Sequence, residues 1–236
     1  GIRVLHRLGS DDFHRRDHAR LLQEEAVDMN GLDPDEPRPE TGTPGRCEEL
    51  MEILLAIVLA VAPGIFWLLF FYSRDRYDPE PPVWVMLVFL LGGAVTFPIG
   101  ILEGSLLAIS EDSLDQLIAP VFEELAKYWV VEKTVYRTHV FDEPVDGIVY
   151  AAAAGLGFAT LENTLYVLSA LDESFLFALQ TAVLRGILSV PAHVLFSVMW
   201  GFALGVSQGG SRRRHDPIVL WGLCLAVGAH ALFNLL

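Results

Sequence analysis

Apolar residues occur along this chain in blocks that are long enough to cross a lipid bilayer. A helix needs about 20 mostly apolar residues to span the ~30 Å hydrocarbon core of a bilayer. The pattern predicts an all-α, polytopic helical membrane protein with about six transmembrane helices, because a membrane β-barrel would alternate apolar and polar positions instead. The predicted spans are Met51–Tyr72, Val83–Ile109, Leu117–Tyr136, Gly147–Leu168, Phe175–Val206 and Ile218–Leu236.

The block Phe175–Val206 is too long for one upright helix, since it would extend about 48 Å at 1.5 Å per residue. We therefore predict a break near Ser189–Pro191, with a tilted extension of the helix as the alternative. Residues Phe175–Arg185 are then expected to form an interfacial helix on the outer side, with the Arg185 side chain reaching towards the surface. The crossing itself would run from about Gly186 to Ser207.

The first fifty residues differ from the rest of the chain in being polar and acidic. They hold twelve of the thirty acidic residues, and residues 32–45 are rich in Pro, Gly, Asp and Glu, as flexible linkers are. We expect residues 1–50 to be a flexible tail and residues 51–236 to be the transmembrane domain. The formal net charge of −14 argues against a nucleic-acid partner.

The charges of the short loops predict the orientation of the chain in the membrane. Lys and Arg gather in cytoplasmic loops. They occur in or next to the first, third and fifth loops (residues 73–82, 137–146 and 209–216), whereas the second and fourth loops carry acidic residues only. We therefore predict that the first, third and fifth loops are cytoplasmic and that both chain ends lie outside a prokaryotic plasma membrane.

Four predicted spans carry ionisable side chains, which are costly at membrane depth. In the predicted orientation Glu123, Glu162 and His230 each lie about 10 Å below the outer face, and the predicted break places His193 at the same depth. A single intramembrane Glu or His is often a structural hydrogen-bonding group. Four segments that place such groups at one depth predict a shared polar site.

Helical spacing orients these groups relative to one another. Adjacent helical residues point about 100° apart, so Glu123 and Glu124 are expected to face different neighbours. Glu123 and Lys127 are four residues apart and share a face, as do His230 and Asn234.

A carboxylate, a histidine and an amide around a wet cavity suit hydrolysis by activated water. In one version a glutamate takes a proton from water, and His and Asn donate hydrogen bonds to the developing oxyanion. In the other, His193, His230 and one carboxylate bind zinc and leave a position for water. The spacing of the residues fits both versions.

In their order along the chain, these motifs resemble those of the PrsW family of intramembrane proteases. The similar motifs are Glu123-Glu124-x-x-Lys127, Phe158-x-x-x-Glu162-Asn163, His193 and His230-x-x-x-Asn234, and the segment from Pro63 to Pro81 is similar to the family's first helix and following loop. The resemblance covers about Met51 to Leu236. It implies a peptidase that cleaves a membrane-anchored anti-sigma factor on its outer side.

The resemblance also implies roles for the site residues. Glu123 would be the general base, Glu124 and Glu162 would be partner, ligand or orienting groups, and Lys127 would hold the carboxylate geometry. His193 and His230 would bind a metal, with Glu162 as the third ligand, or stabilise the oxyanion, helped by Asn234.

The metal and the wider relatives of the family leave further choices open. Members of the family are called metalloproteases, with zinc as the expected ion, while related enzymes suggest glutamate-driven catalysis without a metal. The distantly similar type II CAAX prenyl endopeptidases carry a His where this chain has Glu162, so prenyl-protein processing is not expected.

The expected partners are membrane lipid and a single-pass membrane protein substrate. Two alternatives to the protease remain at this point: a proton- or cation-coupled transporter, because intramembrane Glu, Lys and His also relay protons, and a non-catalytic relative that binds single-pass helices.

Overall fold

The computed structural model describes residues 45–73, 79–107, 112–208 and 217–236. The contacts divide the chain into Gly1–Gly45 and Arg46–Leu236, and the helices below belong to the second unit. No strand occurs in the described residues, which agrees with the predicted all-α membrane protein. The predicted acidic tail up to residue 44 and the basic segments 74–78 and 209–216 lie outside the described residues.

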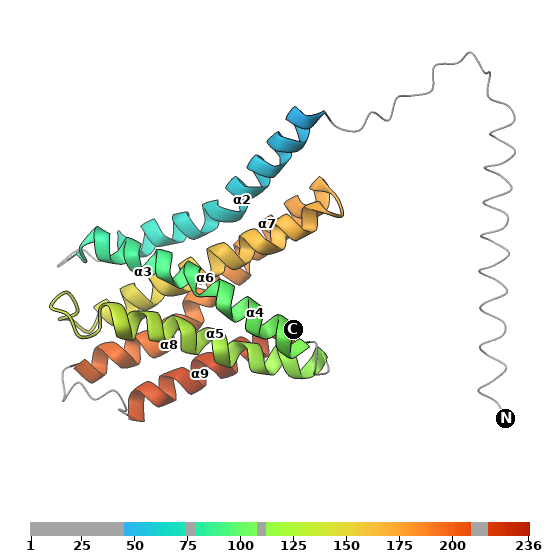
Figure 1. Ribbon diagram of the computed structural model, residues 1–236. Coiled ribbons are helices and arrows are strands. Elements are labelled where there is room, and N and C mark those ends of the chain that lie inside the picture. Colours follow the sequence, from blue (N-terminus) through green and yellow to red (C-terminus); the bar gives the residue numbers. More distant parts are fainter. Residues whose placement is uncertain (1–44, 74–78, 108–111, 209–216) are drawn as a thin grey trace, which may run out of the picture. The chain divides into compact units, whose positions relative to one another are not determined.

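The described part of the second unit consists of helices that follow the predicted spans closely (Figure 1). They are α2 (Arg46–Tyr72), α3 (Pro82–Ala94), α4 (Thr96–Leu107), α5 (Asp112–Thr134), α6 (Asp146–Leu171), α7 (Phe175–Ile187), α8 (Ser189–Gln208) and α9 (Pro217–Asn234).

Four segments of the described chain are long and apolar enough to cross a membrane. They are Arg46–Tyr72, Pro82–Ser105, Phe175–Gln208 and Pro217–Asn234. Helices α5 and α6, which carry the charged residues of the predicted site, are not among them. Helix α6 packs against α2, α3, α7 and α8. A helix enclosed by apolar neighbours in this way can hold more polar residues than a helix that faces lipid.

Two of the predicted spans are each divided into two helices, and a proline follows each division. Helix α3 ends at Ala94 with Pro98 in the first turn of α4, and α7 ends at Ile187 with Pro191 in the first turn of α8. Proline lacks an N–H, and its ring clashes with the carbonyl four residues earlier. Those carbonyls belong to Ala94 and Ile187, the last residues of α3 and α7. The break predicted near Ser189–Pro191 is confirmed.

Helix α7 packs within the bundle, which differs from the predicted interfacial placement. Ala178 and Ala182 of α7 are buried in a cluster with Ala56 and Ala60 of α2. Small side chains of this kind let helices approach closely inside a membrane. Arg185 in the last turn of α7 binds Glu162, and its side chain is 20% exposed, whereas the prediction had it extending to the outer surface.

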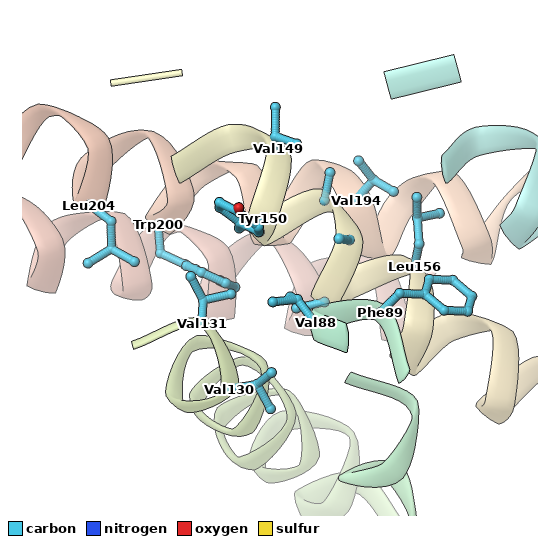
Figure 2. Close-up of a cluster of buried hydrophobic side chains, with 14 of the residues drawn as sticks. Val88, Phe89, Val130, Val131, Val149, Tyr150, Leu156, Val194, Trp200 and Leu204 are labelled. Atoms are coloured by element: carbon cyan, nitrogen blue, oxygen red, sulfur yellow. The ribbon is translucent and has the colours of Figure 1, made fainter. Parts of the chain in front are cut away.

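Helix α6 lies at the centre of the bundle, and the main hydrophobic core surrounds it. Its segment Ala151–Thr160 is buried throughout. Figure 2 shows side chains of the neighbouring helices around Tyr150 and Leu156 of α6. The neighbours that it labels include Val88 and Phe89 of α3, Val131 of α5 and Trp200 and Leu204 of α8.

The helix ends next to the predicted cytoplasmic loops lie together. In Figure 1 the last turns of α2, α5 and α8 and the first turns of α3, α6 and α9 are at one end of the bundle, as the loop charges predict. Buried acids fasten the chain at this end: Tyr150 Oη donates to Glu80 Oε2 over 2.5 Å, and Asp146 Oδ2 accepts 2.7 Å bonds from the N–H groups of Asp142 and Glu143.

Helices α3 and α6 approach each other very closely at Gly157. A Cβ atom at this position would overlap the carbonyl oxygen of Phe89. We expect Gly157→Ala to destabilise the protein by about 1–3 kcal/mol, because the helices would be forced apart. Thermal unfolding in detergent measures the effect. Gly100→Ala in α4 is the control, since a Cβ there has nothing within 4 Å; equal unfolding temperatures for the two variants would contradict the close packing.

Candidate active site

The side chains that the sequence placed at one depth lie together in the structure. Helix α5 contributes Glu123, Glu124 and Lys127, and α6, α8 and α9 contribute one residue each. All six are buried or nearly so, the most exposed being Glu162, whose side chain is 20% exposed. The three from the other helices are Glu162, His193 and His230.

A cavity of about 290 Å³ lies beside this cluster. It has room for several water molecules, each of which takes up about 30 Å³ of liquid. Charged and polar side chains of six helices line it, and Asn234, the last residue of α9, is one of them. The lining residues are Glu103, Gln116, Ala119, Glu123, Glu162, Tyr166, Arg185, Ser189, His193, His230, Phe233 and Asn234.

Glu124 is fully buried and is the centre of a hydrogen-bond network. Its Oε1 accepts a 2.6 Å bond from Lys127 Nζ and lies 3.0 Å from His230 Nδ1, and its Oε2 accepts a 3.1 Å bond from Trp200 Nε1. An ionised carboxylate can only accept, so His230 Nδ1 is the donor in its contact. With its donors in place, Glu124 fixes the positions of Lys127 and His230.

His193 is held in a similar way. Its Nε2 lies 3.1 Å from Glu162 Oε2, and its Nδ1 lies 3.0 Å from Lys127 Nζ. Because a carboxylate only accepts and an ammonium only donates, Nε2 carries the proton and Nδ1 does not. Each histidine therefore gives one N–H to a carboxylate and keeps one bare nitrogen, as histidines that bind metals commonly do.

Glu123 differs from its neighbour Glu124 because its Oε2 is buried yet receives no hydrogen bond from the described residues. The bare nitrogens of both histidines face this atom, His193 Nδ1 at 4.0 Å and His230 Nε2 at 3.9 Å, and Lys127 Nζ lies 3.8 Å away. Glu123, His193 and His230 offer ligand atoms within 4.8 Å of one another, close enough to hold a metal ion.

In this possible metal-ligand set the carboxylate beside the two histidines is Glu123, whereas the sequence analysis predicted Glu162. The Oε2 atom of Glu162 is instead bound by Arg185 Nη2 at 2.5 Å and by His193. The expectation that Glu123 and Glu124 face different neighbours holds in part: Glu123 lines the cavity and Glu124 binds Trp200, but both contact Lys127 and His230. Lys127 is four residues after Glu123 and three after Glu124, so both carboxylates adjoin it on the helix surface.

Two further site residues were missed by sequence reasoning, Trp200 and Arg185. Trp200 binds Glu124, and Arg185 binds Glu162. A signal for Arg185 was present, because Arg185, Ser189 and His193 follow one another at intervals of four and share a helical face. Arg185 was not assigned to the site because residues Phe175–Arg185 were predicted to form an interfacial helix. Trp200 lies seven residues after His193, again on the same face.

Comparison with known proteins gives the family. Residues 80–236 match the family described as PrsW family intramembrane metalloprotease. The chain belongs to the PrsW family. The match begins two residues before α3, and it includes the seven site residues predicted from the sequence and also Arg185 and Trp200.

Individual PrsW proteins are similar over most of their length. Protease PrsW of Geobacillus kaustophilus is 40% identical over 162 residues, which are 67% of this chain and 69% of the relative. Protease PrsW of Bacillus subtilis is 38% identical over 160 residues (66% and 70%), and that of Clostridioides difficile is 28% identical over 192 residues (78% of each). No solved structure matches. The protein is therefore an intramembrane protease, as the motifs predicted, and the transporter alternative has no support.

Proposed function

We propose that this PrsW protease cleaves a single-pass membrane protein, such as a membrane-anchored anti-sigma factor, near the outer face of the plasma membrane. The position of the cavity supports this. Its lining includes Gln116 in the first turns of α5 and Asn234 at the end of α9. The first turns of α5 and the last turn of α9 lie at the end of the bundle opposite the predicted cytoplasmic loops (Figure 1).

One atom supports the chemistry most strongly, the Oε2 of Glu123. Burying a carboxylate oxygen without a hydrogen-bond donor costs folding free energy, so such an oxygen indicates a functional role. Glu123 lines a polar cavity, and its buried Oε2 faces the unprotonated nitrogens of His193 and His230. This arrangement suits the activation of a water molecule for attack on a peptide carbonyl.

The donor set fits a zinc ion. Two histidines and one glutamate are a ligand set of catalytic zinc sites, and the unpaired Oε2 of Glu123 would gain a partner. The charge also fits: four carboxylates and two basic groups around the cavity sum to −4 + 2 = −2 when all are ionised, and a divalent cation would balance them. The charged groups are Glu103, Glu123, Glu124, Glu162, Lys127 and Arg185.

Zinc, when bound there, would supply a Lewis acid that activates water and polarises the carbonyl. The side chains around the cavity orient the ligands, accept the proton and bind the substrate. Glu124 and Glu162 orient the two histidines. Glu162 also lines the cavity, and its carboxylate would accept the proton of the attacking water. The amide of Asn234 donates to the carbonyl oxygen of the substrate.

One observation supports a second mechanism, without a metal. Lys127 Nζ lies 3.0 Å from His193 Nδ1 and already supplies positive charge beside Glu123. Zinc could use that nitrogen only if Lys127 gave up this contact and kept the shorter one to Glu124. In the metal-free version Glu123 Oε2 accepts the proton of the attacking water, and His230 and Asn234 stabilise the oxyanion.

Metal analysis of the purified full chain, paired with a cleavage assay, distinguishes the two mechanisms. We expect about one zinc per chain, lost in His193→Ala and His230→Ala together with activity, while the control His139→Ala keeps both. His139 is exposed and distant in sequence from the site. Metal-free wild-type protein that cleaves at the full rate would overturn the zinc proposal and leave the second mechanism.

A further inference from the structure

Arg185 faces the active-site cavity, and the mechanism above gives it no role in the reaction. Its Nη2 donates to Glu162 Oε2 over 2.5 Å, and its guanidinium carbon lies 3.9 Å from the centre of the Tyr166 ring. The side chain is 20% exposed, and the residue lines the cavity. A guanidinium held by an ion pair on one side and a ring on its face has a fixed plane and direction.

The guanidinium has more donors than the described residues use. Arginine has five N–H groups, and among the described residues the ion pair of Arg185 with Glu162 engages Nη2. The Nε of Arg185 is buried without a hydrogen-bond acceptor in the described chain. Nε is enclosed, so the N–H groups that an acceptor of a ligand can reach are those on the part of the guanidinium that lines the cavity.

The charge of the cavity selects the kind of acceptor. Three carboxylates line the same cavity, from Glu103, Glu123 and Glu162. When no cation is bound, a further anion, such as an acidic side chain of the substrate, would be repelled by them, and Glu162 already offsets the charge of Arg185. A neutral acceptor would not be repelled, and a peptide that reaches the water-activating atoms brings backbone carbonyls into the cavity.

We propose that Arg185 binds a backbone carbonyl oxygen of the substrate beside the scissile bond. This proposal rests on the proposed function, since it assumes a peptide in the cavity. Arg185 is then a substrate-binding residue: it holds an extended segment of the substrate against the site, while Glu162 keeps the guanidinium in place. The alternative is a positioning role, in which Arg185 only orients Glu162 and, through it, His193.

Binding and turnover measured separately distinguish these two roles. The probe is a purified single-pass protein with a fluorescent label, and the full-length protease is placed in lipid nanodiscs. Capture of the probe is measured with Glu123→Gln protein, so that binding is observed without cleavage. We expect Arg185→Gln to weaken capture by at least about tenfold and to raise KM by a similar factor in the active enzyme. For Arg185→Lys we expect capture and KM between those of the parent and of Arg185→Gln, because lysine keeps the charge and loses the planar guanidinium.

Glu162→Gln is the matched control, because it removes the carboxylate charge, keeps an amide oxygen that can still accept a hydrogen bond from Arg185, and retains Arg185. We expect it to lower kcat and to leave capture within about threefold of its Glu123→Gln parent. If Arg185→Gln and Glu162→Gln both lower kcat and leave capture unchanged, Arg185 is a positioning residue and the proposal is wrong. Substituting the acidic residues of the probe with their amides is expected to leave KM unchanged; a large rise would show that Arg185 binds a carboxylate instead and would likewise overturn the proposal.

The failure of the proposed function is visible separately. If the wild-type protein cleaves no single-pass protein, the proposed substrate class fails, while the capture measurement still shows whether Arg185 binds the probe. If capture is also the same with and without Arg185, the binding proposal fails by itself.

Discussion

Replacing Glu123 by glutamine is expected to lower kcat/KM for substrate cleavage by a factor of at least about 10³. Glutamine keeps the shape of the side chain and loses the negative charge. Both mechanisms need that charge at Oε2, either as a zinc ligand or as the acceptor of a proton. Because Oε2 receives no hydrogen bond from the described residues, the substitution leaves no buried donor without its partner. The measurement is the initial rate of cleavage in nanodiscs, together with the unfolding temperature.

Glu132→Gln is the matched control for this variant. Glu132 lies on the same helix and is also buried, but its ion pairs are with Lys133 and Arg137 at the predicted cytoplasmic end. We expect its rate to stay within about threefold of the wild type. A Glu123→Gln protein that cleaves at more than a tenth of the wild-type rate would refute the assignment of Glu123.

Replacing the adjacent Glu124 by leucine is expected to act on stability first. The substitution leaves Lys127, His230 and Trp200 without their common acceptor in the protein interior. Removing one partner of a buried ion pair typically costs about 3–5 kcal/mol, since the other charge stays buried. Thermal unfolding in detergent is expected to show a large fall in Tm for Glu124→Leu and little change for Glu123→Gln. Equal unfolding temperatures for the two variants would contradict the division between a chemical and a structural glutamate.

Much of this fold follows from local rules that a sequence displays directly. Apolar blocks of spanning length locate the helices, and the prolines at Pro98 and Pro191 explain the two breaks. The common depth of Glu123, Glu162 and His230 follows from helical rise and loop charge, and the predicted break adds His193. For that reason the shared site could be predicted before any contact was known.

Which side chain pairs with which could not be predicted in the same way. Contacts within the site depend on helix rotation and on rotamers, which spacing does not determine. Glu162 was expected to be a metal ligand because it shares the depth of the histidines, but Arg185 binds it and Glu123 takes its place beside them. Arg185 was assigned to the surface because α7 was expected at the interface; its packing on the alanines of α2 shows the reason for the difference.

The central claim is that the site around Glu123 hydrolyses a peptide bond of a membrane-anchored protein near the outer leaflet. Intact-mass analysis of a purified single-pass substrate, incubated with wild-type or Glu123→Gln enzyme in sealed vesicles, tests it most directly. The account predicts one cut with the wild type, about 10 Å below the outer membrane boundary, and no cut with Glu123→Gln. A substrate left whole by the wild type, or cut at the same bond by both proteins, would contradict it.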